Sequence, residues 1–317
     1  MKYNFLKYPS LTNQYAMSKS RDLMRVNHED TWYRAEKIDG SNIALVVTPD
    51  GEHHFQTRNN VIDDFTSDKF KNYSSLEAMD FTHEIEKIKE YYFPLEDNHS
   101  VLLFGGLYGV GIQKRTGYDL QKSGEHNVRF FTLMEADFTK KVYCISSLDT
   151  LLQVVTDSHR VLGIKKDVFG SLADAEPYTE SHYGGVAEGE VWMPLNGQEQ
   201  SFGTAMYGVK WKTEKFAEVS RKKHEKHTRP DLDMNLLDSL RAYVTENRLN
   251  NILSHGNISN TRKSVGTMIK FMQEDIKTEY MRDNGIEGEE ELEKITLHLR
   301  SLNKNIASVV LANLPVE

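Results

Sequence analysis

Short β-prone runs separated by turn signals occupy the first two thirds of the chain. Residues 33–37 and 42–47 are two such runs, split by Asp39-Gly40, and a turn at 48–51 precedes a third run at 54–57. This pattern predicts a strand, a tight turn and a hairpin. Further strands are expected at residues 101–104, 128–134, 141–145, 189–193 and 206–211, and helices at 75–92 and 148–162.

The hydrophobic period changes after Pro230. A run of charged residues, 221–229, ends at this proline, so we place a domain boundary there. The expected domains are residues 1–229, built of strands and helices, and residues 230–317, which are all helical. Apolar side chains in the second domain recur at helical spacing in three groups, which are Leu236, Leu237, Leu240, Tyr243 and Val244, then Val265, Met268, Ile269, Met272 and Ile276, then Leu292, Ile295, Leu299, Leu302, Ile306 and Val309.

Length and composition agree with two domains and with the absence of membrane spans. The 317 residues are 38% apolar, which suffices for a core, and a single core rarely exceeds about 250 residues. There is no run of about 18 apolar residues and no signal-peptide pattern at the start, so we expect a cytoplasmic protein. The single cysteine, Cys144, excludes an internal disulfide and cysteine-based zinc clusters, and its place between Tyr143 and Ile145 predicts a buried strand position.

The net charge of −8 argues against a protein that holds a polyanion, because the charge of the whole molecule sets long-range attraction. The excess is unevenly spread, however. Residues 231–317 carry 14 acidic and 10 basic side chains, a net of −4, which leaves −4 for residues 1–230. Residues 221–229 hold five basic side chains and one acidic. A polyanionic ligand is thus compatible with the composition if contact is confined to one basic face, with modest and salt-sensitive binding.

A lysine at the end of an apolar strand is the first candidate for chemistry. Lys37 is followed by Ile38, Asp39 and Gly40, and burial at such a position lowers the pKa of a lysine so that it can act as a nucleophile. Gly40 lets the chain turn sharply, so that Asn42 can reach the same ligand. Alone, this tetrapeptide is better explained by a turn with a solvated lysine.

Two later motifs add charged groups. Glu188 enters a strand just before Gly189 and could coordinate a divalent metal ion, or could be a solvated strand-start glutamate. Lys210 and Lys212 alternate with Val209 and Trp211, so both cations face one side of a strand, as a phosphate cradle or as a wet sheet edge.

The order of these motifs is more specific than any one of them, because a nucleophile, a metal carboxylate and phosphate cations are what a covalent nucleotidyltransferase needs. With these residues the chain resembles the lysyl-adenylate superfamily of ligases and capping enzymes, most closely the branch of bacteriophage double-strand RNA ligases and kinetoplastid RNA-editing ligases. The resemblance covers about residues 30–216 and, more loosely, the helical tail. It implies an α+β fold, with an ATP-grasp-like adenylation (nucleotidyltransferase) domain of antiparallel sheets and flanking helices, followed by a small all-α domain.

The resemblance also implies roles for single residues. Lys37 would take AMP, Glu188 would bind the metal ion, and Lys210 and Lys212 would contact the α-phosphate; these four are the expected catalytic residues. The other expected nucleotide-binding residues are Glu36 and Ile38 beside the adenine, Asn42 on the ribose or phosphate side, Arg58 toward the nucleotide or the 5′-phosphate, and Phe130 stacked on the purine.

Two positions stay open. If Phe130 stacks on the purine, strand alternation makes Phe131 the core residue, and the reverse choice is nearly as good. The family usually has a ribose-binding glutamate third in Phe-Gly-Glu-x-x-Gly, and Gly106 takes that place here. Either the chain is altered there, or a neighbour such as Glu135 substitutes, or catalysis is weakened.

The implied reaction is ATP-dependent joining of RNA 3′-hydroxyl and 5′-phosphate ends, at nicks in duplex or bridged RNA, through a lysyl-AMP enzyme and an adenylylated 5′-end. The expected cofactor is Mg²⁺ or Mn²⁺, and the expected role is RNA repair by a monomeric protein. Residues 221–229 are the candidate contact with the RNA duplex. Two features favour RNA over DNA as the substrate. Asn42 stands where DNA ligases and capping enzymes typically have an arginine, and a helical tail follows where those enzymes append an oligonucleotide-binding barrel. The alternatives are a DNA ligase, a GTP-using capping enzyme, or a catalytically weak RNA-binding protein that keeps the fold.

Overall fold

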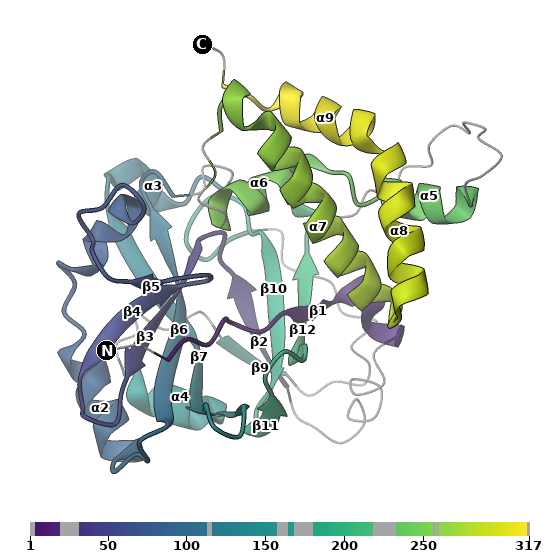
Figure 1. Cartoon of the computed structure of the whole chain (residues 1–317). Helices are drawn as coiled ribbons and strands as arrows, with labels where there is room; N and C mark the ends of the chain where they lie inside the picture. The colour runs from purple at the N-terminus through teal and green to yellow at the C-terminus, as the bar shows by residue number, and fades with distance from the viewer. Residues whose placement is uncertain are drawn as a thin grey trace. The chain divides into compact units, whose positions relative to one another are not determined.

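The computed structural model describes residues 4–19, 32–112, 116–156, 164–167, 180–217, 233–255, 258 and 260–315. The chain divides into two compact units, Met1–Thr213 and Glu214–Glu317 (Figure 1). The boundary expected near Pro230 and the basic segment 221–229 both lie outside the described residues.

Two β-sheets form the first unit. The five-stranded sheet has the order β1-β12-β10-β2-β9, in which β1 and β12 are parallel and the other neighbours antiparallel. Its strands are β1 (Leu11–Asn13), β2 (Trp32–Lys37), β9 (Ile164–Asp167), β10 (Gly189–Pro194) and β12 (Met206–Lys212). The seven-stranded sheet is antiparallel, with the order β11-β8-β7-β6-β3-β4-β5. Its strands are β3 (Ser41–Val47), β4 (His53–Thr57), β5 (Val61–Ile62), β6 (His99–Gly109), β7 (His126–Asp137), β8 (Val142–Ile145) and β11 (Gln198–Ser201).

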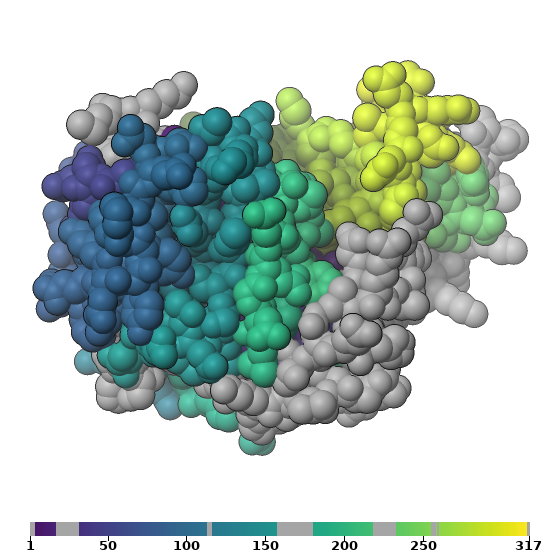
Figure 2. Space-filling view, turned by 90° about the horizontal axis from the view of Figure 1, so that it is seen from below, coloured from purple at the N-terminus to yellow at the C-terminus, as the bar shows by residue number. Residues whose placement is uncertain are grey.

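Short helices flank the seven-stranded sheet. Phe81, which precedes α2 (Thr82–Tyr92), packs edge-on against Phe55 of β4 and Phe130 of β7, with ring centroids 5.2 and 6.0 Å apart. α4 (Leu148–Val154) contacts both α2 and β7. Figure 2 shows the blue and teal segments that contain α2 and α4 side by side. The other helical segments of this unit are η1 (Gln14–Lys19), η2 (Lys71–Leu76) and α3 (Asp119–Ser123).

The predicted α+β class is confirmed, while several element bounds differ from the prediction. The strand expected at 101–104 extends over all of β6, because β3 and β7 pair with it on both sides. The helix expected from residue 75 begins at Thr82, whose N–H donates to the Asp80 carboxylate at 2.9 Å. α4 ends at Val154, and the predicted helix beyond residue 156 falls outside the described residues. The short elements β1, β5, β9, β11 and α3 had no distinct sequence signal.

The second unit is helical, as expected. Met268, Met272 and Ile276 of α7 are fully buried together with Ile306 and Val310 of α9, so the periodic apolar positions form one core. No helix in the described part of the chain is both long and apolar enough to cross a bilayer. The helices are η4 (Glu214–Phe216), α5 (Met234–Arg241), α6 (Glu246–His255), η5 (Arg262–Ser264), α7 (Val265–Asn284), α8 (Glu289–Ser301) and α9 (Asn303–Ala312).

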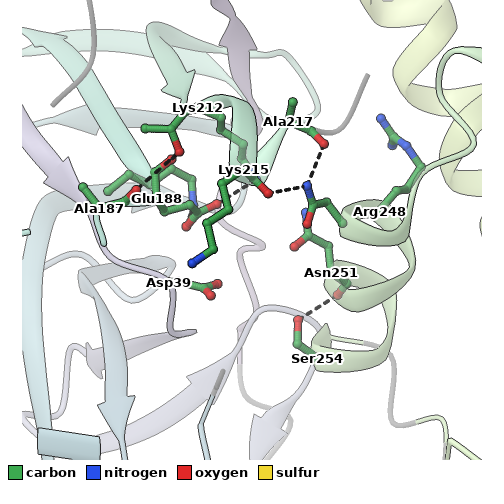
Figure 3. A network of polar contacts seen from close by, with 12 residues as sticks. Asp39, Ala187, Glu188, Lys212, Lys215, Ala217, Arg248, Asn251 and Ser254 are labelled. Carbon is green, nitrogen blue, oxygen red and sulfur yellow. Dashed lines mark hydrogen bonds and ion pairs between the residues drawn. The ribbon is translucent and has the colours of Figure 1, made fainter. Parts of the chain in front are cut away.

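The short segment that starts the second unit is attached to α6. The side-chain amide of Asn247 donates to the carbonyl oxygens of Lys215 and Ala217, both at 2.9 Å (Figure 3). Within α6, the neighbouring Arg248 is buried and donates from Nε to the carbonyl of Tyr243 at 3.1 Å. These polar contacts tie residues 215–217 to the helical core that follows.

Cys144 lies on β8 as expected, but its side chain is exposed, so the prediction of a buried position was wrong. Tyr143 and Ile145 are buried, and strand alternation therefore turns Cys144 to the opposite face, where its Sγ lies 3.8 Å from the Glu199 carboxylate. Partial burial and the charges of Glu199 and Glu135 raise the pKa of the Cys144 thiol.

We expect Cys144 to react completely with an aromatic disulfide reagent without denaturant, but more slowly than a small-molecule thiol near neutral pH, since a raised pKa leaves less thiolate. Glu199→Gln removes one of the charges that raise this pKa and should speed the reaction. Release of the coloured thiol measures both rates. A cysteine that reacts only after denaturation would contradict the exposed position.

Candidate active site

Three neighbouring strands bring three of the predicted catalytic residues together. In the five-stranded sheet, Gly189 of β10 pairs with Lys37 of β2 on one side and with Lys212 of β12 on the other. Glu188 directly precedes Gly189 and therefore lies between the two lysines. Its Oε2 accepts a hydrogen bond from Lys37 Nζ at 2.7 Å, and its Oε1 lies 2.7 Å from Lys212 Nζ. Figure 3 shows Glu188 next to Lys212.

The backbone around Glu188 is fixed by close approach to β12. Gly189 has φ +156°, and a Cβ there would lie 1.9 Å from the carbonyl oxygen of Trp211, so a glycine is required. The Thr213 N–H donates to the carbonyl of Glu188 at 3.0 Å, and the Thr213 hydroxyl lies 3.4 Å from the carbonyl of Ala187 (Figure 3). The Glu188 carboxylate is therefore held at the end of β12, where Lys212 is located.

The three charges are unequally accessible. The Glu188 side chain is 2% exposed, that of Lys212 10%, and that of Lys37 25%. Burial lowers the pKa of Lys37; Glu188 opposes this effect by stabilising the ammonium, and Lys212 adds to it. Burial alone would raise the pKa of Glu188, but Lys212 and Lys37 hold it below its usual value. Of these three groups, the most accessible is the expected nucleophile, and Asp39 is a further carboxylate whose charge acts on it.

The turn after Lys37 is confirmed. The Gly40 N–H donates to the carbonyl of Ile38 at 3.1 Å, and the Asp39 N–H donates to the hydroxyl of Tyr118 at 2.9 Å. Tyr118 is fully buried, so the turn rests on an internal polar contact. Ile38 itself packs against the core of the first unit. Tyr118 lies 81 positions from Lys37 along the chain, and no sequence motif marks it.

Glu36 does not share a face with Lys37. Successive side chains of β2 alternate, so Tyr33 and Lys37 lie on one face and Glu36 lies on the other. The Glu36 carboxylate accepts hydrogen bonds from the Ser181 hydroxyl and from the His182 N–H, the latter at 2.8 Å. Burial raises its pKa, although both donors oppose this effect. Only the backbone of Glu36 is therefore adjacent to the Lys37 side of the sheet.

The structure distinguishes between the two phenylalanines of β7. Phe130 is fully buried against Phe81, on the helix-covered face of the seven-stranded sheet. Phe131 is half-buried at a register shift, where Phe104 pairs with Thr132 and Gly105 with Phe130. The Tyr33 hydroxyl lies 3.5 Å from the carbonyl of Phe131 and belongs to the Lys37 face of β2. The Phe131 ring packs edge-on against Tyr8, whose ring also packs against Phe104, with centroids 5.3 and 5.0 Å apart. Phe131 thus lies on the face of the seven-stranded sheet opposite to that of Phe130.

Asn42, Gly106 and Arg129 lie side by side across β3, β6 and β7. A Cβ at Gly106 would meet none of the described atoms within 4 Å. Within the same described part, the buried Oδ1 of Asn42 has no hydrogen-bond partner. Because buried polar atoms are normally satisfied, an open space beside such an acceptor fits a polar ligand.

Glu135 does not substitute for the glutamate missing at position 106. It lies six residues from Arg129 on β7, roughly 20 Å away along an extended strand. Its carboxylate is 2.7 Å from Nδ1 of His99, at the opposite end of β6 from Gly106.

The remaining predicted residues lie on the expected elements. Lys210 is half-buried on β12, two residues before Lys212, while Val209 and Trp211 are fully buried on the opposite face, as predicted. Arg58 is half-buried directly after β4. The described residues contain no group of three or more histidine, cysteine or acidic side chains that could hold a metal ion. An ion held at Glu188 would therefore take most of its ligands from water and nucleotide phosphates, as Mg²⁺ commonly does.

Two family models match the chain. A model of the RNA ligase family matches residues 30–226, and a model of the T4 RNA ligase 2 C-terminal region matches residues 227–313. Since the first match covers more than half of the sequence, the chain belongs to the RNA ligase family.

Solved structures of Naegleria gruberi RNA ligase resemble the chain more weakly. A mutant with ATP and Mn has a TM-score of 0.44 and 14% sequence identity, covering 68% of this chain and 58% of that chain. A mutant with AMP and Mn has a TM-score of 0.44 and 15% identity over the same shares. The chain therefore spans somewhat more than half the length of these proteins. The comparison with curated proteins finds no match.

The two charged neighbours of Lys37 should shift its pKa in opposite directions. Glu188→Gln removes the carboxylate that stabilises the ammonium, so the pKa of Lys37 should fall. Lys212→Met removes a competing cation, so this pKa should rise. A pH titration of the lysine Nζ by nuclear magnetic resonance measures both, with the exposed Lys140→Met as control. Shifts in the same direction for the two variants would contradict the described cluster.

Proposed function

We propose that the chain is an ATP-dependent RNA ligase that joins 3′-hydroxyl and 5′-phosphate RNA ends through a lysyl-AMP intermediate on Lys37. The observation that carries the proposal is the buried Glu188 carboxylate held between Lys37 and Lys212. Membership of the RNA ligase family supports RNA as the substrate. The site supplies an accessible nucleophile with a lowered pKa next to a second cation, which suits attack on a phosphate.

In the first step, the neutral amine of Lys37 attacks the α-phosphorus of ATP. A bond forms between Nζ and phosphorus, the bond to the bridging oxygen of the β-phosphate breaks, pyrophosphate leaves, and the amine loses a proton to solvent. Such in-line transfers require the protein mainly to position groups and to neutralise charge. Lys210 and Lys212 provide the charge at the α-phosphate, and Glu188 aligns Lys37 with Lys212 beforehand.

Two further transfers complete the reaction. An oxygen of the RNA 5′-phosphate attacks the phosphorus of lysyl-AMP, the bond to Nζ breaks, and Lys37 recovers a proton. The RNA 3′-hydroxyl then attacks the 5′-phosphate and loses its proton to solvent, a phosphodiester forms, and AMP leaves with the electron pair of the broken anhydride bond. All three steps are phosphoryl transfers, so one arrangement of cations serves each of them.

Glu188 is the residue that would hold Mg²⁺ or Mn²⁺, directly or through water. The ion would neutralise charge on the phosphates when bound. We assign purine stacking to Phe131, because it packs with Tyr8 on the face of the seven-stranded sheet that also carries Asn42 and Gly106. We assign contact with the nucleoside sugar to Asn42 beside Gly106.

Residues 1–229 would act as the adenylyltransferase domain and residues 230–317 as a helical domain. The substrate would be nicked duplex or bridged RNA, joined during RNA repair in the cytoplasm by a monomeric enzyme. Arg58 would contact the nucleotide or the 5′-phosphate.

Incubation with a divalent metal and α-labelled ATP, GTP or NAD tests the proposal. We expect covalent label from ATP that Lys37→Ala and Lys37→Arg both abolish, since arginine keeps the charge but not the nucleophile. Nicked RNA duplexes should then be sealed in preference to nicked DNA. Label from GTP would indicate capping chemistry instead, and a protein that binds RNA but takes no label would be the catalytically weak alternative.

Gly106→Glu tests the open space beside Asn42. Because a Cβ there meets no described atom, the variant should melt within about 2 °C of the wild type and keep or raise nucleotidyl transfer. Gly105→Glu is the matched control, since a Cβ at residue 105 would lie 2.9 Å from the Arg129 carbonyl oxygen and from the Phe130 ring. This variant should have a much lower melting temperature. A stable Gly106→Glu variant without transfer would show that the position does not border the nucleotide.

A further inference from the structure

The loop that carries Glu188 is held by two consecutive residues of β2. We call residues 181–188 the Glu188 loop. At its C-terminal end, Glu188 accepts a hydrogen bond from Lys37. At the other end, Ser181 and His182 both donate to the carboxylate of Glu36. Because Glu36 and Lys37 point to opposite faces of β2, the loop passes from one face of the strand to the other.

The carboxylate of Glu36 is buried where it accepts these two hydrogen bonds. Glu36 is 3% exposed, whereas His182 is exposed to solvent. The Ser181 Oγ also accepts the Tyr183 N–H at 3.0 Å, so the bonds at this end form a connected set. A buried carboxylate with two donors is costly to leave without them, and it therefore favours the loop conformation that supplies them.

The middle of the Glu188 loop is attached elsewhere. The ring of Tyr183 packs against Tyr108 at 5.8 Å, and the guanidinium of Arg129 lies 4.8 Å above it. The Tyr183 carbonyl accepts the Asp119 N–H at 2.9 Å, and the Val186 N–H donates to the Thr116 carbonyl at 3.0 Å. These contacts join the loop to residues near β6 and α3, so Glu36 provides its anchor on the strand of the nucleophile.

We propose that Glu36 is a positioning residue for Glu188. By fixing Ser181 and His182 on β2, its carboxylate sets the path of the Glu188 loop, so that Glu188 meets Lys37 and Lys212 in register. Glu36 then acts on phosphoryl transfer through the loop and not by contact of its side chain with the base. The catalytic part of this inference rests on the function proposed above, while the structural part does not.

Amide hydrogen exchange of the nucleotide-free protein tests the structural part. Glu36→Ala should speed exchange of the His182 and Tyr183 amides about tenfold or more, while the amides of β6 keep their protection. Ser181→Ala removes one of the two donors and should give a smaller change in the same direction, which also covers the case that Glu36→Ala does not fold. Glu36→Gln keeps an acceptor for His182 and should restore most of the protection.

Glu190→Gln is the matched control. Glu190 pairs directly with Glu36 across β2 and β10 and is equally buried, but its carboxylate bonds to Arg34 and not to the Glu188 loop. In the Glu190→Gln variant, the amides of residues 182 and 183 should exchange at the same rate as in the wild type.

The rate of lysyl-AMP formation tests the catalytic part. Glu36→Ala should lower the maximal rate about tenfold or more with little change in the apparent KM for ATP, and Glu36→Gln should recover most of the rate. A raised KM, or label taken equally from ATP and GTP, would instead mean that the side chain contacts the base. Unchanged exchange in Glu36→Ala would overturn the inference. A wild type that takes no label would refute the proposed ligase alone, because the exchange result does not depend on activity.

Discussion

A buried carboxylate between two ammonium groups is the interaction on which the rest of the first unit depends. A charge with 2% exposure is costly unless it is fully paired, and Glu188 is paired on both oxygens. The pairing requires β2, β10 and β12 to lie in this order and in this register, since a slip of one residue would turn a lysine to the opposite face. The sheet is thereby constrained by three charges.

Apolar packing on the opposite face of the same strands also fixes their order and register. Trp192 and Trp211 are fully buried and stacked, with ring centroids 4.9 Å apart, and the guanidinium of Arg34 lies 4.6 Å above Trp192. Strand alternation therefore separates two tasks. The tryptophans hold β10 against β12 by burial, and the lysines lie on the other face.

The sequence predicted local turns and alternation better than partners that are distant along the chain. The turn residues after Lys37, the glycine after Glu188 and the alternation around Lys212 each have a local cause, so the sequence alone was enough to predict them. The orientation of Phe131 was not predictable, because a register shift in β7 breaks the alternation on which the choice depended. The partners of Glu36 come from Ser181 and His182, and no local pattern reveals a pairing over such a distance in sequence.

The parallel pairing of β1 with β12 has a consequence for the order of folding. Residues 11–13 lie beside residues 206–210, so the strand that carries Lys210 and Lys212 has its outer neighbour almost two hundred positions earlier in the chain. Contacts of such high sequence separation form late, since loop closure must precede them. On a ribosome, the early strand has to wait as an unpaired edge until residue 212 has emerged. The five-stranded sheet is thus among the last parts to assemble, and a chain that ended before residue 210 would lack both Lys210 and Lys212.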